Sequence, residues 1–313
     1  MIRRTNNSVV GVMRLAFTVA AVATLLCAGL ATTPAYAAVI LGTYQFASSD
    51  SEVPTSTGMT FGAFGRNIVT AVSTSGVFNS KGWNTGISLA EYVNFTLTAN
   101  SGYRLILGSM TFDTMGDSKR PTTGEVRYSN NSYALGGTFI VTNTSANKSW
   151  DFADVTTAAA GSVTFRLYGY NAQNAQGEMR FDNMAITGDT QALARLSASA
   201  AAGPAKVLVG ATGVQETVTV NNSAFTAGTM ASQGLDYTLG LSGAVGMSLV
   251  TSSGTNVAAG ASNDNFVAVN TATSGAKSAT LTIASTNAWQ QTSLPSLSTV
   301  NVYLYFRRFS DGL

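Results

Sequence analysis

Residues 162–170 read SVTFRLYGY, and this stretch indicates the fold class. Val163, Phe165 and Leu167 fall on one side of an extended chain, and the polar and tyrosine residues between them fall on the other. Such alternation predicts a β-strand with one buried face. Similar runs of about four to eight residues recur along the chain between Gly, Asn and Ser turns. The sequence therefore predicts an all-β protein built from β-sandwiches.

Two positions in these runs predict irregular strands. Residues 178–188 read EMRFDNMAITG, in which the apolar residues change parity halfway. One extra residue at Asp182–Asn183 restores a single apolar face, so we predict a β-bulge there. Gly108, in the middle of the run 103–113, predicts a second bulge or bend. The first bulge would place four apolar side chains on one face: Met179, Phe181, Met184 and Ile186.

The predicted strands fall into two groups. Residues 38–189 predict a jelly-roll-like β-sandwich. Residues 190–306 have shorter, more regular strands with turns about every ten residues, which is typical of an immunoglobulin-like sandwich. The alanine-rich segment 191–205 is interpreted as a strand or linker, because Gly and Pro follow it directly. Residues 307–313 form a tail.

The N-terminus carries an export signal. Three arginines and no acid surround the start of the apolar run at 15–30, and the small residues Ala35 and Ala37 mark a cleavage site before Ala38. The run is shorter than the roughly 20 residues that a membrane-spanning helix needs. We therefore predict that residues 1–37 are a signal peptide and that the protein is secreted or lies at the cell surface. A retained N-terminal anchor is the alternative.

Composition excludes several kinds of function. Without the three arginines of the signal peptide, the basic residues fall from 17 to 14 against 15 acids, so no excess of positive charge indicates nucleic acid as a partner. The single cysteine, Cys27, lies in the signal peptide, so no disulfide is expected. Histidine is absent, which excludes Ser-His-Asp and Cys-His catalysis as well as imidazole metal sites. We expect no enzymatic activity and no cofactor other than a structural calcium ion.

Carboxylates supply the remaining catalytic and metal-binding candidates. A glycosidase needs two of them across a cleft, and acids cluster at three places in the sequence. Asp182 and Asn183 offer hard oxygen ligands that suit calcium. The alternative is that these two residues satisfy backbone groups at the bulge. The clusters are Asp113, Asp117 and Glu125; Asp151 and Asp154; and Glu178 and Asp182.

Aromatic residues supply a candidate ligand platform. Tyr168 and Tyr170 share parity with Arg166 on one face of a strand, where sugar rings could stack. Trp83, in a turn between Gly82 and Asn84, could serve likewise, or it could fill the core.

Several motifs resemble secreted bacterial surface proteins of the PEP-CTERM-associated type, which combine a jelly-roll-like module with an Ig-like domain. The resemblance implies a cell-surface or extracellular-matrix role with no defined reaction. Such proteins usually continue into a Pro-Glu-Pro sorting signal, whereas this sequence ends at Leu313 without one, which suggests free release or truncation. The motifs that carry the resemblance are 60–64 (TFGAF), 82–83 (GW), 92–97, 101–103 (SGY), 165–170 (FRLYGY) and 180–184 (RFDNM) in the first half, with 213–222, 258–262 and 269–275 in the second.

Three hypotheses follow. The first is a non-enzymatic surface or matrix protein with an adhesive or scaffolding role, whose partners are extracellular polysaccharide or other surface proteins. The second is a carbohydrate-binding protein that uses Tyr168, Tyr170 and Arg166. The third is an enzyme that acts on polysaccharides through carboxylates.

Overall fold

The computed structural model describes residues 39–201, 203–291 and 300–303. The predicted signal peptide and the tail at 307–313 lie outside the described residues. Within the described ranges the chain forms β-strands and one short 3-10 turn, η1 (Ser129–Asn131), but no α-helix. The prediction of an all-β protein is confirmed. The described ranges also contain no helix that is long and apolar enough to span a membrane.

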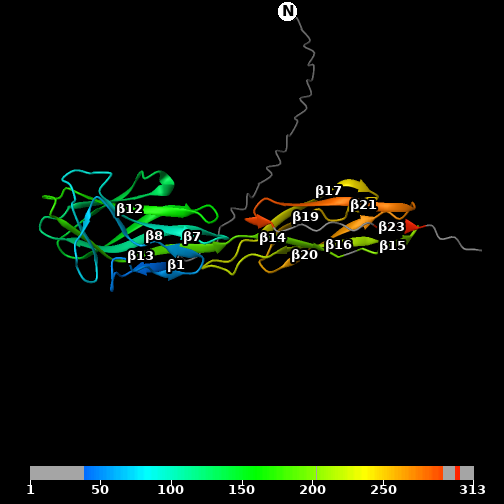
Figure 1. Ribbon diagram of the computed structural model, residues 1–313, viewed down its shortest axis with the longest axis horizontal. Coiled ribbons are helices and arrows are strands. Elements are labelled where there is room, and N and C mark those ends of the chain that lie inside the picture. Colours follow the sequence, from blue (N-terminus) through cyan, green and yellow to red (C-terminus); the bar gives the residue numbers. More distant parts are fainter. Residues whose placement is uncertain (1–38, 202, 292–299, 304–313) are drawn as a thin grey trace, which may run out of the picture. The chain divides into compact units, whose positions relative to one another are not determined.

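The first half of the described chain forms two antiparallel sheets, coloured blue to green in Figure 1. Sheet A has the order β11 (Ala146–Thr156), β8 (Tyr103–Gly116), β13 (Glu178–Ala192), β6 (Phe78–Lys81) and β5 (Thr70–Ala71), with β1 (Val39–Tyr44) also paired to β13. Sheet B has the order β10 (Leu135–Ile140), β9 (Thr123–Tyr128), β12 (Ser162–Tyr170), β7 (Tyr92–Ala99), β3 (Met59–Phe61) and β2 (Thr55–Ser56), with β4 (Gly65–Asn67) paired to β7.

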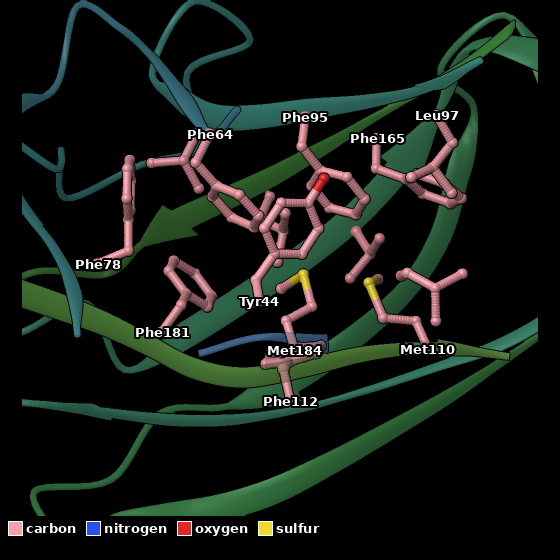
Figure 2. Close-up of a cluster of buried hydrophobic side chains, with 14 of the residues drawn as sticks. Tyr44, Phe64, Phe78, Phe95, Leu97, Met110, Phe112, Phe165, Phe181 and Met184 are labelled. Atoms are coloured by element: carbon pink, nitrogen blue, oxygen red, sulfur yellow. The ribbon is translucent and has the colours of Figure 1, made fainter. Parts of the chain in front are cut away.

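An aromatic core joins these two sheets (Figure 2). The ring of Tyr44, from sheet A, lies edge-on to Phe95 of sheet B with their centroids 5.4 Å apart. Phe95 in turn stacks on Phe165 of the next strand at 5.2 Å. Offset and edge-to-face pairs of this kind stabilise a core beyond the effect of the area they bury. Val163, Phe165 and Leu167 are fully buried in this core, as the alternating pattern of residues 162–170 predicts.

Both predicted bulges are confirmed. The pairing of β13 with β8 shifts between Asp182 and Ala185, so β13 has one more residue than β8 across this interval. Asn183 at the bulge has a left-handed backbone with φ of 48°. On β8, Gly108 is skipped where the partners change from Ser109 to Leu107. As a result the following apolar side chains of β13 are all fully buried: Met179, Phe181, Met184 and Ile186.

The second half of the described chain forms two further sheets around a separate core. The predicted strand or linker at 191–205 contains the end of β13, which runs to Ala192 past the predicted boundary at 189, and then β14 (Arg195–Ala200). One sheet has the order β18 (Met247–Leu249), β20 (Ser262–Val269), β16 (Gln215–Asn222), β14 and β22 (Gln290–Gln291). The other has the order β15 (Lys206–Leu208), β23 (Val300–Tyr303), β21 (Gly275–Ser285), β17 (Leu235–Val245) and β19 (Ser253–Val257).

Candidate functional site

Three neighbouring strands of sheet B bring tyrosine and arginine side chains together on the side of the sheet that faces away from the core. Strand β12 pairs with β7 on one side and with β9 on the other. Tyr168 is directly opposite Tyr92 on β7 and Glu125 on β9. Side chains directly opposite each other on adjacent strands point the same way, so these groups share one surface. We call this surface the tyrosine face; it consists of Tyr92, Glu125, Arg127, Tyr133, Arg166, Tyr168 and Tyr170.

Arg166 occupies the centre of the tyrosine face. Its guanidinium carbon is 3.7 Å from the centroid of the Tyr133 ring and 4.4 Å from that of Tyr92. Both distances are within the range of cation–π attraction. Burial acts to lower the pKa of Arg166, but its hydrogen bond with Tyr168 and the neighbouring tyrosines outweigh that effect and raise the pKa overall. The side chain is therefore a fixed positive charge at the surface of the sheet.

Arg127 lies beside Arg166 on the neighbouring strand, directly opposite it in the sheet. Its Nε donates to the carboxylate of Glu125, a residue that is only 4% exposed. One of its terminal amino groups donates to the backbone carbonyl of Tyr133 at 3.1 Å. The charge of Arg127 is thus matched locally, and its side chain anchors the loop that carries Tyr133.

Tyr133 reaches Arg166 because of unusual backbone geometry after β9. Ser132 and Tyr133 are both in the left-handed region, with φ of 59° and 58°. Such a conformation is uncommon for residues other than glycine and is maintained only where surrounding contacts enforce it. Here the Tyr133 amide donates to the Tyr128 carbonyl at 3.0 Å, while Arg127 binds the Tyr133 carbonyl. These contacts turn the chain back over sheet B.

The candidate ligand residues predicted from the sequence differ in how exposed they are on this face. Arg166 and Tyr170 lie on it and are partly exposed, as the alternating pattern predicts. Tyr168 also lies on it, but only 1% of its surface is exposed, because Tyr92, Arg127 and Arg166 surround it. Burial also raises the pKa of Tyr168. The prediction that a sugar stacks on Tyr168 itself is therefore corrected. This ring is covered, and it packs against the side chains that form the exposed surface of the face.

Trp83 is a second correction. Its side chain has no exposed surface and belongs to the aromatic core. The indole Nε1 donates to the backbone carbonyl of Ser80 at 2.9 Å, which satisfies its one polar group. A side chain with no accessible ring face cannot stack on a ligand, so the core-filling interpretation of Trp83 is the right one.

Tyr92, Tyr133 and Arg127 are the members of the tyrosine face that the sequence did not single out as site candidates of any kind. Tyr92 directly precedes the buried Val93 in an alternating stretch and has the opposite parity, which is a sequence signal for an outward side chain. No such signal marks Tyr133, because it lies in a loop. The order of strands in the sheet brings all three residues beside Arg166. No local sequence pattern predicts that order.

Neutral polar groups extend the tyrosine face along the same strands. Asn94 is directly opposite Arg166, and the hydroxyls of Thr96 and Thr164 are 2.8 Å apart across the next outward pair. These side chains are partly exposed. Hydroxyl and amide groups of this kind can both donate and accept hydrogen bonds.

Hydrogen bonds within the protein hold the bulge at Asp182 and Asn183. The Asn183 amide N–H donates to Asp182 Oδ1 at 2.7 Å, and the Asn183 side chain donates to Asp113 Oδ2 at 2.9 Å. The other oxygen of Asp113 accepts from Asn147 at 2.9 Å. Within the described residues no group of three or more His, Cys, Asp or Glu could hold a metal ion. Asp182 thus satisfies one backbone group at the bulge, as the alternative to a metal site requires, and the calcium site stays a prediction.

Two acids of the carboxylate hypothesis also meet in this region. Asp113 and Asp182 are directly opposite each other on β8 and β13 and line one cleft of about 240 Å³. Hydrogen bonds from Asn183 and Asn147 lower the pKa of Asp113, whereas burial raises that of Asp182. The one aromatic residue lining this cleft, Phe181, has its side chain fully buried in the core. The cleft thus offers a carboxylate pair but no ring face on which a sugar could stack.

No protein-family model and no curated protein matches the sequence. Among solved structures, a variant of a carbohydrate binding module of family 29 aligns with 48% of this chain and 90% of its own, at 14% identity and a TM-score of 0.30. The CBM22-1 xylan-binding domain from Paenibacillus barcinonensis Xyn10C covers 49% and 97%, at 17% identity and a TM-score of 0.23. The K2 cleaved adhesin domain of Lys-gingipain covers 46% and 96%, at 15% identity and a TM-score of 0.27. With TM-scores this low, these similarities do not indicate a ligand for this chain.

Proposed function

We propose that this protein is a secreted, non-catalytic polysaccharide-binding protein and that the tyrosine face of sheet B is its binding surface. The observation that carries the proposal is the group formed by Tyr92, Tyr133 and Arg166. It places two partly exposed aromatic rings and a charged donor at the centre of a sheet surface.

The chemistry of the face suits a carbohydrate. Sugars present apolar ring faces that pack on aromatic side chains, together with hydroxyls that need donors and acceptors around them. Tyr170 and Arg166 lie four residues apart on β12, a span of about 13 Å along an extended strand. The threonine hydroxyls and Asn94 flank this span. The surface is therefore long and polar around an aromatic centre, as a chain of sugar units requires.

This proposal makes the second sequence hypothesis the preferred one and gives the first a physical basis. Adhesion in an extracellular matrix would follow from binding the matrix polysaccharide, and a place among the secreted surface proteins named above fits that role. The second sandwich, which has its own core, would then act as a spacer.

Affinity electrophoresis tests the proposal. The purified protein is run through gels that contain one soluble polymer each: xylan, mixed-linkage glucan, dextran or polygalacturonate. We expect at least one polymer to retard the protein. We expect Tyr133→Ala and Tyr92→Ala each to weaken the affinity for that polymer about fivefold, given that a stacked aromatic ring contributes on the order of 1 kcal/mol.

Phe266→Ala is the matched control. Phe266 is a partly buried aromatic residue on β20 of the second sandwich, so its loss changes aromatic content without touching sheet B. Retardation that survives both tyrosine substitutions, or that is lost equally in Phe266→Ala, would contradict the proposed surface. A protein that no polymer in a wide panel retards would contradict the function itself.

A further inference from the structure

The tyrosine face carries a positive charge that has no internal counterion among the described residues. The seven strands of sheet B contain three arginines and a single acid, Glu125. Arg127 is paired with Glu125, and Arg66 is paired with Asp50. Arg166 forms no ion pair within the described part of the chain, although the face around it is built to hold its guanidinium in place.

The way in which Arg166 is held leaves its charge available. Its position is fixed by the rings of Tyr92 and Tyr133 and by the Tyr168 side chain, rather than by a carboxylate. Its Nε is buried and has no acceptor among the described residues. An incoming anion would therefore not have to displace an internal partner. It would also meet a group whose rotamer is already restricted, which lowers the entropic cost of pairing.

We infer that the tyrosine face selects polysaccharides that carry carboxylate groups, that is, polymers of uronic acids, and that Arg166 is the residue that pairs with the carboxylate. The inference rests on the proposed function, since it specifies the ligand class of the same face. A planar guanidinium matches a planar carboxylate with two parallel hydrogen bonds. Sulfate esters share the negative charge, and the experiment below separates the two.

The test compares pairs of polymers that share a backbone and differ in whether they carry an anionic group. Polygalacturonate carries one carboxylate per sugar, and its methyl ester has the same backbone with that charge removed. Dextran sulfate and dextran form the corresponding pair for sulfate. In isothermal titration at 0.15 M salt we expect polygalacturonate to bind at least about tenfold more tightly than its methyl ester. Raising the salt should narrow this ratio, because the pair is partly exposed to solvent.

Variants then assign the preference to one residue. Arg166→Gln should bring the ratio between the acid and ester polymers close to one, and Arg166→Lys, which keeps the charge but not the planar fork, should retain part of it. Arg180→Gln is the control. Arg180 is a partly buried arginine on sheet A whose Nε also lacks an acceptor, but it is paired with Glu178. Its variant should leave the ratio unchanged.

The possible outcomes distinguish a failure of this inference from a failure of the proposed polysaccharide binding. Equal binding of polygalacturonate and its methyl ester, or tight binding of neutral polymers alone, overturns the inference and leaves the proposed function standing. Tighter binding of dextran sulfate than of polygalacturonate overturns the choice of carboxylate. Failure to bind any polymer overturns both. Because the polymer pairs are measured on the unaltered protein, these outcomes do not depend on the folding of any variant.

Discussion

The contact between Arg166 and Tyr133 offers a quantitative test of the tyrosine face without any ligand. The guanidinium carbon lies 3.7 Å from the ring centroid of Tyr133. Cation–π pairs contribute about 0.5–1 kcal/mol at exposed sites and about 2 kcal/mol when desolvated. Arg166 and Tyr133 are both partly exposed, so we expect a coupling energy of about 1 kcal/mol between them. In a domain of this size that energy corresponds to roughly 2–4 °C in Tm.

A double-mutant cycle measures this coupling. Urea unfolding is followed for the unaltered protein, Arg166→Gln, Tyr133→Leu and the double variant, and the non-additive part of the unfolding free energy is the coupling. Leucine keeps an apolar side chain at the same left-handed position, so backbone strain changes little between the members of the cycle. Arg166 with Tyr170 is the control cycle, since the structure gives no contact between them, and its coupling should be within about 0.3 kcal/mol of zero. A coupling for Arg166 and Tyr133 no larger than that of the control would refute the arrangement described for this face.

Three further predictions concern the sandwich around the face. Trp83→Ala should destabilise the protein by about 3–5 kcal/mol in urea unfolding, because the fully buried indole leaves a cavity; a loss below about 1 kcal/mol would mean that the ring lies at the surface. Hydrogen bonds from Asn79 and Arg180 lower the pKa of Glu178 in the folded protein. The ionised carboxylate therefore stabilises the fold fully at pH values above the pKa of Glu178 in the unfolded chain. This stabilisation is lost as the pH falls through the lowered pKa of the folded state. Glu178→Gln should therefore reduce Tm at pH 7 and make Tm less dependent on pH below about 5, and identical acid profiles for the two proteins would count against this pair. Calcium at millimolar concentration should leave Tm unchanged, since Asp182 Oδ1 and both carboxylate oxygens of Asp113 already accept hydrogen bonds; a clear rise in Tm would support a calcium site.

Local patterns in the sequence predicted the strands that have one buried face. The alternation in 162–170 arises because the core is on one side of sheet B, so the pattern and the burial have the same cause. The bulge at Asp182–Asn183 could be predicted for the same reason, since a change of parity within one buried strand has few other solutions. Arg166 and Tyr170 were placed on the outer face by that parity alone.

What the sequence could not supply is the order of strands and the burial of outward side chains. Tyr168 has outward parity, yet it is covered because Tyr92 and Arg127 lie on the strands next to it. Tyr133 enters the face through two consecutive left-handed residues in a loop, which no alternation can reveal. Trp83 follows a glycine with a φ of 98°, and such a turn can direct an indole either to solvent or to the core.

Mapping of backbone amide chemical shifts is the most direct test of the central claim. The isotope-labelled protein is titrated with an oligosaccharide cut from the polymer that retards it most, and the shifted amides are placed on the structure. We predict that the largest shifts fall on β7, β9 and β12 and on the loop around Tyr133. Saturable shifts confined to sheet A, to its cleft at Asp113 and Asp182, or to the second sandwich would contradict the account.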